Sequence, residues 1–306
     1  MRPSKSVTRV TSVLDVCKVW KPQIIFCDFD KTITKRDTVA DVVNVAKKYW
    51  RDPASTEKKM NDHLKWYFGR YESLQKQVFA KLEKKFDEWS KSKQETETKE
   101  ERLQEVIKVF SEYDDNERES VNRMNNTPEL FANIPKRVLE NITKENNDLN
   151  RRDHVLECLG QMMSDTSNEL YILSMNWSPH TIYHCLDKRV SWDHIICNNL
   201  LLQDDLTTGI LQSKVLNCKD KFDWTQKLLL KYQEKLLSKN GTKIRSLYIG
   251  DNEWDFVSGM NCDVSVWIKP HPQKETNTPW LQLFEKHQKV FHKWFLNDPV
   301  IVDKWK

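Results

Sequence analysis

The chain has 306 residues, about twice the roughly 150 residues of an average domain, so we expect one large domain or a core that carries a substantial insertion. Hydrophobic residues make up 38% of the chain and charged residues 31%, a balance too apolar for general disorder, and the net charge of +4 is weak support for a nucleic-acid partner. Only six residues are glycine and no stretch approaches about 18 consecutive apolar residues, which argues against collagen-like, glycine-rich and membrane-spanning segments.

The first strong pattern is the apolar run of residues 24–27, which predicts a short strand buried on both faces. From Thr38 to about Asn150 the pattern becomes helical, and Thr38 with Asp41 predicts a capping box at the first turn. Aromatic residues and valines alternate there with Lys and Glu, and the polar segment 91–102 indicates an exposed helix or a connection between helices.

A break at residues 125–128 and a helix from Pro135 complete this helical part. Beyond Arg151, helices and strands alternate. The predicted strands are 170–173, 194–197, 246–249 and 264–268. The predicted helices are 155–163, one from residue 179, 221–237 and an aromatic C-terminal helix, 280–295, with a turn at 207–209.

This alternation predicts an α/β fold with a doubly wound, mostly parallel sheet. We expect a Rossmannoid core formed by residues 1–36 and 151–306. The insertion between them, residues 37–150, is expected to be an all-helical cap.

The seven cysteines are odd in number, scattered, and form no C-x-x-C pair. Zinc-finger and thioredoxin-like chemistry are therefore disfavoured, and we interpret the cysteines as small buried hydrophobic residues of a reducing compartment, with the cytoplasm as the expected location. A mitochondrial location is the alternative, because the first 22 residues are basic and rich in Ser and Thr, with Asp15 as the single acidic residue.

Polar residues follow the carboxyl ends of three predicted strands, where open α/β sheets bind their ligands. They are Asp28, Asp30, Ser174, Asp251 and Asp255. Carboxylates gathered in one crevice need a cation to stay ionised, and Mg²⁺ prefers such oxygen ligands together with water and phosphate. A carboxylate held near a metal-bound phosphate can attack phosphorus and form an aspartyl-phosphate, while a lysine and a hydroxyl hold the other phosphoryl oxygens.

These residues carry a resemblance to a known family. The D-x-D-x-T pattern of residues 28–32, Ser174, Lys221 and the G-D-x-x-x-D pattern of residues 250–255 resemble, in order, the four motifs of the haloacid dehalogenase (HAD) superfamily. The long insertion between the first two motifs resembles the helical cap of the phosphoserine-phosphatase-like subclass. Within it, the chain is similar to a fungal group linked to growth in the cold and to the phosphatase half of plant thiamine-monophosphate phosphatases.

The resemblance implies a role for each acidic residue. Asp28 would be the nucleophile and a metal ligand, and Asp30 the general acid and base, with its backbone carbonyl on the metal. Asp251 would be the second side-chain ligand, and Asp255 would orient Asp251 without binding the metal itself.

The resemblance also implies that Ser174, Lys221 and Thr32 bind the substrate phosphate. Lys219 is the alternative to Lys221, because both lie at the start of one predicted helix. Glu253 and Trp254 are bulky for the turn between the acidic residues of the fourth motif.

The expected function is Mg²⁺-dependent hydrolysis of a small phosphorylated metabolite, with no nucleic-acid or membrane partner; the sequence does not indicate an oligomeric state. Thiamine monophosphate, pyridoxal phosphate and flavin mononucleotide are possible substrates by resemblance. The alternative is a non-catalytic HAD-like binding or regulatory protein. The cap aromatics Trp50, Trp66, Tyr67 and Tyr71 either stack on a substrate or, as their helical spacing favours, pack in the core.

Overall fold

The computed structural model describes residues 12–92, 98–143, 151–164, 168–240, 244–269, 279–287, 289–290 and 298–306. Within these ranges, no helix combines the length and the hydropathy needed to cross a membrane.

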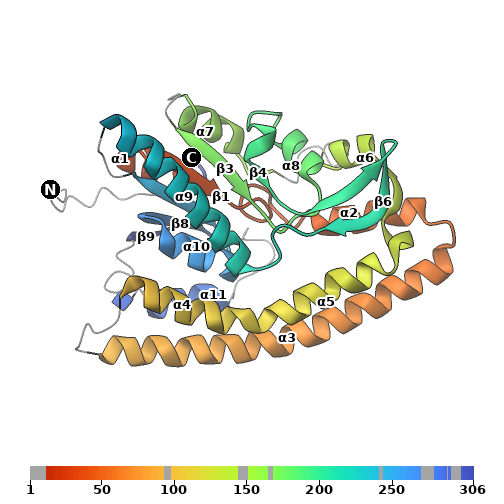
Figure 1. Ribbon diagram of the computed structural model, residues 1–306, viewed down its shortest axis with the longest axis horizontal. Coiled ribbons are helices and arrows are strands. Elements are labelled where there is room, and N and C mark those ends of the chain that lie inside the picture. The colour runs from red at the N-terminus through yellow and green to blue at the C-terminus, as the bar shows by residue number, and fades with distance from the viewer. Residues whose placement is uncertain are drawn as a thin grey trace.

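A six-stranded parallel sheet forms the centre of the molecule and confirms the predicted α/β class (Figure 1). In spatial order its strands are β4 (Ile195–Ile196), β3 (Glu169–Leu173), β1 (Ile24–Cys27), β7 (Ser246–Gly250), β8 (Val264–Ile268) and β9 (Asp298–Val302). β1 lies between β3 and β7, with Ile25 level with Leu170 on one side and Leu247 on the other. This central position explains why all four residues of β1 are apolar and buried.

Alternate residues of the central strands face opposite sides of the sheet. Ile25 and Cys27 of β1 face one hydrophobic core. The helices on that side are α1 (Val13–Trp20), α7 (Val155–Met162) and α8 (Pro179–Cys185). α1 is absent from the elements that the sequence predicts.

Ile24 and Phe26 of β1 face the opposite side, where Leu228 and Tyr232 of α9 cover them. The helices there are α9 (Cys218–Asn240) and α10 (Phe256–Asn261). With helices on both faces, the sheet is doubly wound, as predicted.

The insertion contributes a long helical layer. Its elements are α2 (Val39–Ala46), η1 (Lys47–Tyr49), α3 (Pro53–Lys91), α4 (Lys99–Phe110), η2 (Ser111–Tyr113), α5 (Asp114–Asn125), η3 (Pro128–Leu130), β2 (Ala132–Pro135) and α6 (Lys136–Asn141). Figure 1 shows α3 running along one side of the molecule, with α4 and α5 lying along it. Phe86 of α3 and Phe110 of α4 pack on Phe256 of α10, with ring centroids 6.0 and 6.4 Å apart. Part of the insertion therefore covers the core. The predicted domain boundaries at residues 37 and 150 stay a prediction.

The insertion is not all helical, which corrects one detail of the predicted fold. β2 pairs antiparallel with β6 (Leu206–Gln212), and β6 pairs with β5 (Asn199–Gln203). The predicted turn at residues 207–209 is also wrong, because these residues lie within β6. Gly209 has a φ of +85° there, and a Cβ on it would lie 2.0 Å from the Pro128 carbonyl oxygen, so only glycine permits this approach of η3.

The predicted C-terminal aromatic helix begins as expected with α11 (Pro279–Lys286), whereas residues 291–295 lie outside the described residues. His287, which follows α11, packs on Phe86 of α3 at 5.5 Å between ring centroids. All seven cysteines are free, and six are buried, in agreement with their interpretation as small core residues.

Candidate active site

The carboxyl ends of the central strands open into a cavity of about 990 Å³. Its lining includes five of the residues that the sequence singles out: Asp28, Asp30, Ser174, Lys221 and Asp251. They come from the loops after β1, β3 and β7 and from the first turn of α9, and the edge of the parallel sheet brings them together. The insertion forms the opposite wall.

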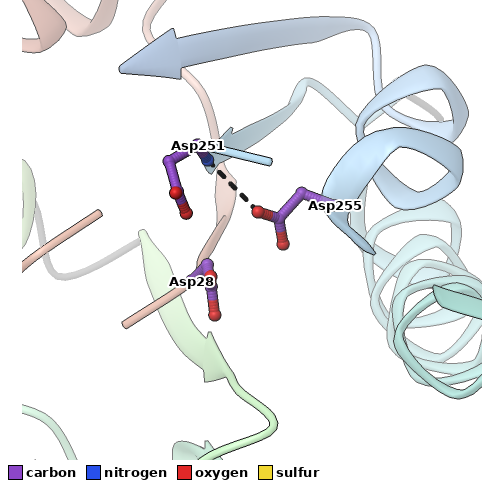
Figure 2. A group of neighbouring side chains, drawn as sticks. All are labelled: Asp28, Asp251 and Asp255. Carbon is purple, nitrogen blue, oxygen red and sulfur yellow. Dashed lines mark hydrogen bonds between the residues drawn. The ribbon is translucent and has the colours of Figure 1, made fainter. Parts of the chain in front are cut away.

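Asp28, Asp251 and Asp255 each present a carboxylate oxygen within 4.8 Å of the others (Figure 2). The ammonium of Lys221 is 3.0 Å from Asp28 Oδ1 and 2.6 Å from Asp255 Oδ1. Lys221 is 1% exposed and Asp28 is 4% exposed, so this ion pair is shielded from water. Lys219, by contrast, is exposed and pairs with Asp223 on the outer face of α9, which favours Lys221 as the third-motif lysine.

Asp255 does not line the cavity, and its carboxylate is already occupied by donors. Oδ1 accepts from Lys221 and, at 2.8 Å, from the Tyr248 hydroxyl, while Oδ2 accepts from the backbone N–H of Asp251 at 3.2 Å (Figure 2). The geometry fits the expected role of Asp255 in orienting Asp251. A Cβ on Gly250 would lie 2.6 Å from the Asp255 side chain, which explains the glycine before Asp251.

Asp251 Oδ1 accepts hydrogen bonds from the Thr32 hydroxyl and from Asn252 Nδ2, both at 3.0 Å. Thr32 is completely buried and lies outside the lining of the cavity. Its expected contact with the substrate phosphate stays a prediction. In the structure the Thr32 hydroxyl donates to Asp251, a candidate metal ligand.

Asp30 remains partly open to the cavity and is held by two neighbours. Its Oδ1 accepts from the backbone N–H of Thr38 at 2.7 Å and from the Thr38 hydroxyl at 2.6 Å, and its Oδ2 accepts from Asn176 Nδ2 at 2.8 Å. The predicted capping box between Thr38 and Asp41 is wrong because the Thr38 hydroxyl binds Asp30 instead of capping α2. Burial and the nearby Asp37 raise the pKa of Asp30 to about 7, although these hydrogen bonds oppose the shift.

The carboxylates at this site outnumber the lysine ammonium that contacts them, which favours the binding of a cation. Burial, and then the charge of Asp255, raise the pKa of Asp28 well above its usual range, and the same two causes raise the pKa of Asp251 to about 7. Burial alone would lower the pKa of Lys221, but the carboxylates of Asp255 and Asp28 outweigh it and raise that pKa. Asp28 and Asp255 thus share one ammonium, with the carboxylate of Asp251 beside them, and this all-oxygen donor set fits Mg²⁺.

Ser174 is buried at the end of β3, and its hydroxyl oxygen accepts from the backbone N–H of Asn176 at 3.1 Å. Its place in the cavity lining, beside Asp28 and Lys221, suits the expected contact with a phosphoryl group. Asn176, which binds Asp30, is a site residue that sequence reasoning missed. Its position two residues after Ser174 at a strand end is the signal that points to it.

The cap aromatics divide into two groups. Tyr67 and Tyr71 line the cavity, whereas Trp50 is buried and donates its Nε1–H to the Leu130 carbonyl at 2.9 Å. Trp66 lies outside the lining, with the guanidinium groups of Arg70 and Arg123 over its ring at 5.3 and 4.0 Å. The core packing that helical spacing favours is found for Trp50, whereas Tyr71 both packs against the core and lines the cavity.

Glu253 and Trp254 are accommodated by contacts with the insertion. Glu253 accepts hydrogen bonds from the Tyr71 hydroxyl and from Gln75 Nε2, both at 3.0 Å. Trp254 packs on Tyr113, with ring centroids 4.8 Å apart. These two bulky residues thus join the loop after β7 to α3 and η2.

No family model matches the chain. It is 25% identical over 165 residues to Cold tolerance protein 1 of Saccharomyces cerevisiae, an alignment that covers 52% of this chain and 51% of that protein. The chain thus spans about half the length of this curated relative. The match agrees with the resemblance to the fungal cold-tolerance group that the motifs indicate.

Solved structures are also similar to the chain at low identity. One is a phospho-aspartyl intermediate analogue of phosphoserine phosphatase, 13% identical, covering 92% of this chain and 93% of that chain with a TM-score of 0.45. A second is a protein of unknown function from Bordetella pertussis Tohama I, 12% identical, covering 92% and 97% with a TM-score of 0.45. A third is a probable phosphoserine phosphatase from Vibrio cholerae, 12% identical, covering 89% and 68% with a TM-score of 0.45.

Proposed function

We propose that this protein is a Mg²⁺-dependent phosphomonoester hydrolase that acts on a small phosphorylated metabolite through an aspartyl-phosphate. The observation that carries the proposal is the position of Asp28. Its carboxylate faces the cavity at the end of the central strand, 3.0 Å from a buried lysine, with Asp251 beside it. This arrangement combines a nucleophile, a positive charge for phosphoryl oxygens and a cation site.

The reaction divides into two displacements at phosphorus. In the first, a carboxylate oxygen of Asp28 forms a bond to phosphorus, the bond to the ester oxygen breaks, and Asp30 gives its proton to the departing alcohol. In the second, Asp30 takes a proton from water, the water oxygen bonds to phosphorus, and the acyl phosphate bond breaks to restore the Asp28 carboxylate. A pKa of about 7 for Asp30 suits both directions of proton transfer near neutral pH.

Lys221 and Ser174 would bind the phosphoryl oxygens during both steps. The side chains of Asp28 and Asp251, with the backbone carbonyl of Asp30, would hold Mg²⁺. The ion, when bound, supplies positive charge against phosphoryl oxygens. Thr32 and Asp255 would position Asp251 through the contacts described above.

The test is phosphate release from a panel of phosphorylated metabolites, with Mg²⁺ or with EDTA, by the wild type and by Asp28→Asn. We expect Asp28→Asn to reduce release by about 1,000-fold or more, because loss of a nucleophile removes the covalent route. Asp115→Asn is the matched control, since Asp115 is exposed on α5 and outside the cavity lining. It should retain wild-type release, and EDTA should abolish release until Mg²⁺ is restored.

Equal release by Asp28→Asn and the wild type would falsify the nucleophile assignment. The non-catalytic alternative predicts instead that the wild type releases phosphate from no ester on the panel. That alternative is disfavoured because an acid, a base and a cation already surround the candidate nucleophile. The seven free cysteines favour a reducing compartment, and we propose the cytoplasm as the location.

A further inference from the structure

Two histidines of α8 face the same carboxylate, away from the candidate active site. His180 and His184 are four residues apart, so they occupy one face of this helix. His180 Nδ1 is 3.9 Å and His184 Nε2 is 3.7 Å from a single oxygen, Glu140 Oε1. None of the three residues lines the cavity that holds Asp28. We call these three residues the His–Glu cluster.

The carboxylate of the cluster comes from a different part of the chain. Glu140 lies on α6, in the insertion, whereas α8 follows β3 of the core. The sequence between the two histidines contains no acidic residue, unlike the H-E-x-x-H pattern, so only the packing of α6 on α8 supplies the carboxylate. A buried hydrogen bond from the Thr181 hydroxyl to the Leu139 carbonyl, 3.0 Å long, joins the direct neighbours of His180 and Glu140. The two helices are therefore fixed relative to each other at this point.

Aromatic side chains hold the two imidazole rings. Trp192 packs on His180 with ring centroids 4.8 Å apart, and Tyr183 lies edge-on to His184 at 5.7 Å and to Trp192 at 5.3 Å. The side chains of both histidines are 16% exposed, and that of Glu140 is 23% exposed. The rings are thus packed in defined positions, and an ion from solution can still reach them.

The distances within the cluster are longer than hydrogen bonds and close to those of a metal site. A hydrogen bond from a ring nitrogen joins atoms about 2.7–3.2 Å apart. Ligands that lie about 2.0–2.2 Å from Zn²⁺ in a tetrahedral site are about 3.4 Å from one another. The distances of 3.7 and 3.9 Å therefore need to shorten by only about 0.3–0.5 Å.

The two rings must also turn toward each other before they can bind one ion. Among the described residues, the acidic group at the end of the sheet is the one whose ligand atoms already lie within 4.8 Å of one another. Rotation of a partly exposed imidazole about its side-chain bonds moves its nitrogens without moving the helix. The cluster is therefore an open arrangement of ligands that a metal ion would close.

One ammonium competes for the carboxylate of the cluster. Lys136 Nζ is 3.9 Å from Glu140 Oε1 and also 3.9 Å from Asp205 Oδ1. The side chains of Lys136 and Asp205 are 37% and 84% exposed, so water screens these ion pairs and each contributes little to stability. Lys136 can keep Asp205 as its partner when a metal ion takes Glu140.

We propose that His180, His184 and Glu140 form a Zn²⁺ site that joins the insertion to the core. Two imidazoles and one carboxylate are a ligand set that suits Zn²⁺, whereas Mg²⁺ prefers oxygen ligands alone. Water would take the fourth position of a tetrahedral site. The site shares no residue with the proposed phosphatase centre, so the two proposals stand or fall separately.

The experiment measures Zn²⁺ binding by titration calorimetry in excess Mg²⁺, which competes for the all-oxygen site at the end of the sheet. We expect the double variant His180→Gln/His184→Gln to bind Zn²⁺ about tenfold or more weakly than the wild type. Loss of two ligands should cost at least as much affinity as loss of a residue that supports a ligand. His154→Gln is the matched control, because His154 is exposed and pairs with the single carboxylate of Glu157 at 3.3 Å. It should keep the wild-type affinity.

Equal Zn²⁺ affinity of the wild type and the double variant, or no binding by the wild type, would overturn the proposal. A second measurement covers the case in which the double variant does not fold: X-ray absorption at the zinc edge of the wild type with one equivalent of Zn²⁺ and excess Mg²⁺. We expect nitrogen and oxygen ligands at about 2.0–2.2 Å, with the outer-shell scattering of imidazole rings. Ligands at about 2.3 Å, the Zn–S distance, or a spectrum without imidazole scattering would contradict the site.

Discussion

At the end of the cavity next to the sheet, which we call the sheet end, Asp28 and Asp255 share the ammonium of Lys221. At the end lined by Tyr67 and Tyr71, which we call the cap end, Glu117 and Glu253 accept hydrogen bonds from neutral donors only. The sheet end is built from loops that follow buried strands, so the core fixes the positions of its charges around Lys221. The cap end combines Glu117 from a helix of the insertion with Glu253 from the loop region after β7, and the hydrogen-bond donors to both carboxylates are neutral. Under the proposed function, this contrast predicts that the core binds the phosphate common to all phosphomonoesters and that the insertion selects the rest of the substrate.

The largest effect is expected from Lys221→Met, which removes the only ammonium in contact with Asp28 and Asp255 among the described residues. A buried pair that loses one partner leaves an uncompensated charge, and the free energy of unfolding should fall by about 4 kcal/mol. Urea denaturation at pH 7 measures it. The double variant Lys221→Met/Asp255→Asn should recover part of this loss, and no recovery would contradict the electrostatic explanation.

A steric change at the same end should have the next largest effect. In Gly250→Ala, the new Cβ would lie 2.6 Å from Asp255, and overpacking of this kind costs about 1–3 kcal/mol. Because Asp255 positions Asp251, phosphate release should fall as well. Gly69→Ala is the control: nothing lies within 4 Å of a Cβ at Gly69, in the middle of α3, so it should stabilise the protein by about 0.5–1 kcal/mol. Thermal unfolding and phosphate release of the two variants distinguish a local clash from a general effect of alanine.

The core strands and the candidate-site carboxylates are predictable from the sequence because their signals are local. Each motif follows a short buried apolar run, and parallel strands must bring their carboxyl ends to one edge. The choice between Lys219 and Lys221 as the third-motif lysine cannot be made from a local signal. The two residues differ only in the face of α9 that they occupy.

The partners of these carboxylates depend on tertiary contacts and could not be predicted. The Thr38 hydroxyl could accept from the backbone N–H of Asp41 or donate to the carboxylate of Asp30, and the approach of Asp30 across the start of the insertion decides between the two. In the sequence Tyr248 is indistinguishable from other core aromatic residues of a strand, and only the structure shows that its hydroxyl donates to Asp255. β2 contains Asn133 and Pro135 and has no strand pattern of its own, so only its pairing with β6 reveals it.

Glu117 at the cap end should add its own contribution to the pH dependence of stability, beside the raised pKa values of Asp30 and Asp251 at the sheet end. Burial raises the pKa of Glu117 from 4.5 to about 7, so the folded chain binds this proton more tightly than the unfolded chain. The resulting stability is complete below about pH 4.5 and is lost as the pH rises through 7, with an upper bound of about 3 kcal/mol at pH 8. Glu117→Gln cannot ionise, so its urea midpoint should fall less than that of the wild type between pH 5 and pH 8. If the urea midpoints of the two proteins fall equally between pH 5 and pH 8, ionisation of Glu117 does not contribute to the loss of stability.

The smallest expected effect separates stability from metal binding at the sheet end. Thr32→Val keeps the shape of a buried side chain but removes the hydrogen bond to Asp251, at a cost of about 1 kcal/mol in the free energy of unfolding. Since the same bond orients a candidate metal ligand, the Mg²⁺ concentration for half-maximal phosphate release should rise about tenfold. Thr225→Val is the matched control, because its buried hydroxyl donates only to the Lys221 carbonyl one turn earlier in α9. A similar loss of stability in both variants, with a rise in the Mg²⁺ requirement for Thr32→Val alone, would show that Thr32 acts on the metal through Asp251. An unchanged Mg²⁺ requirement in Thr32→Val would reduce its role to packing.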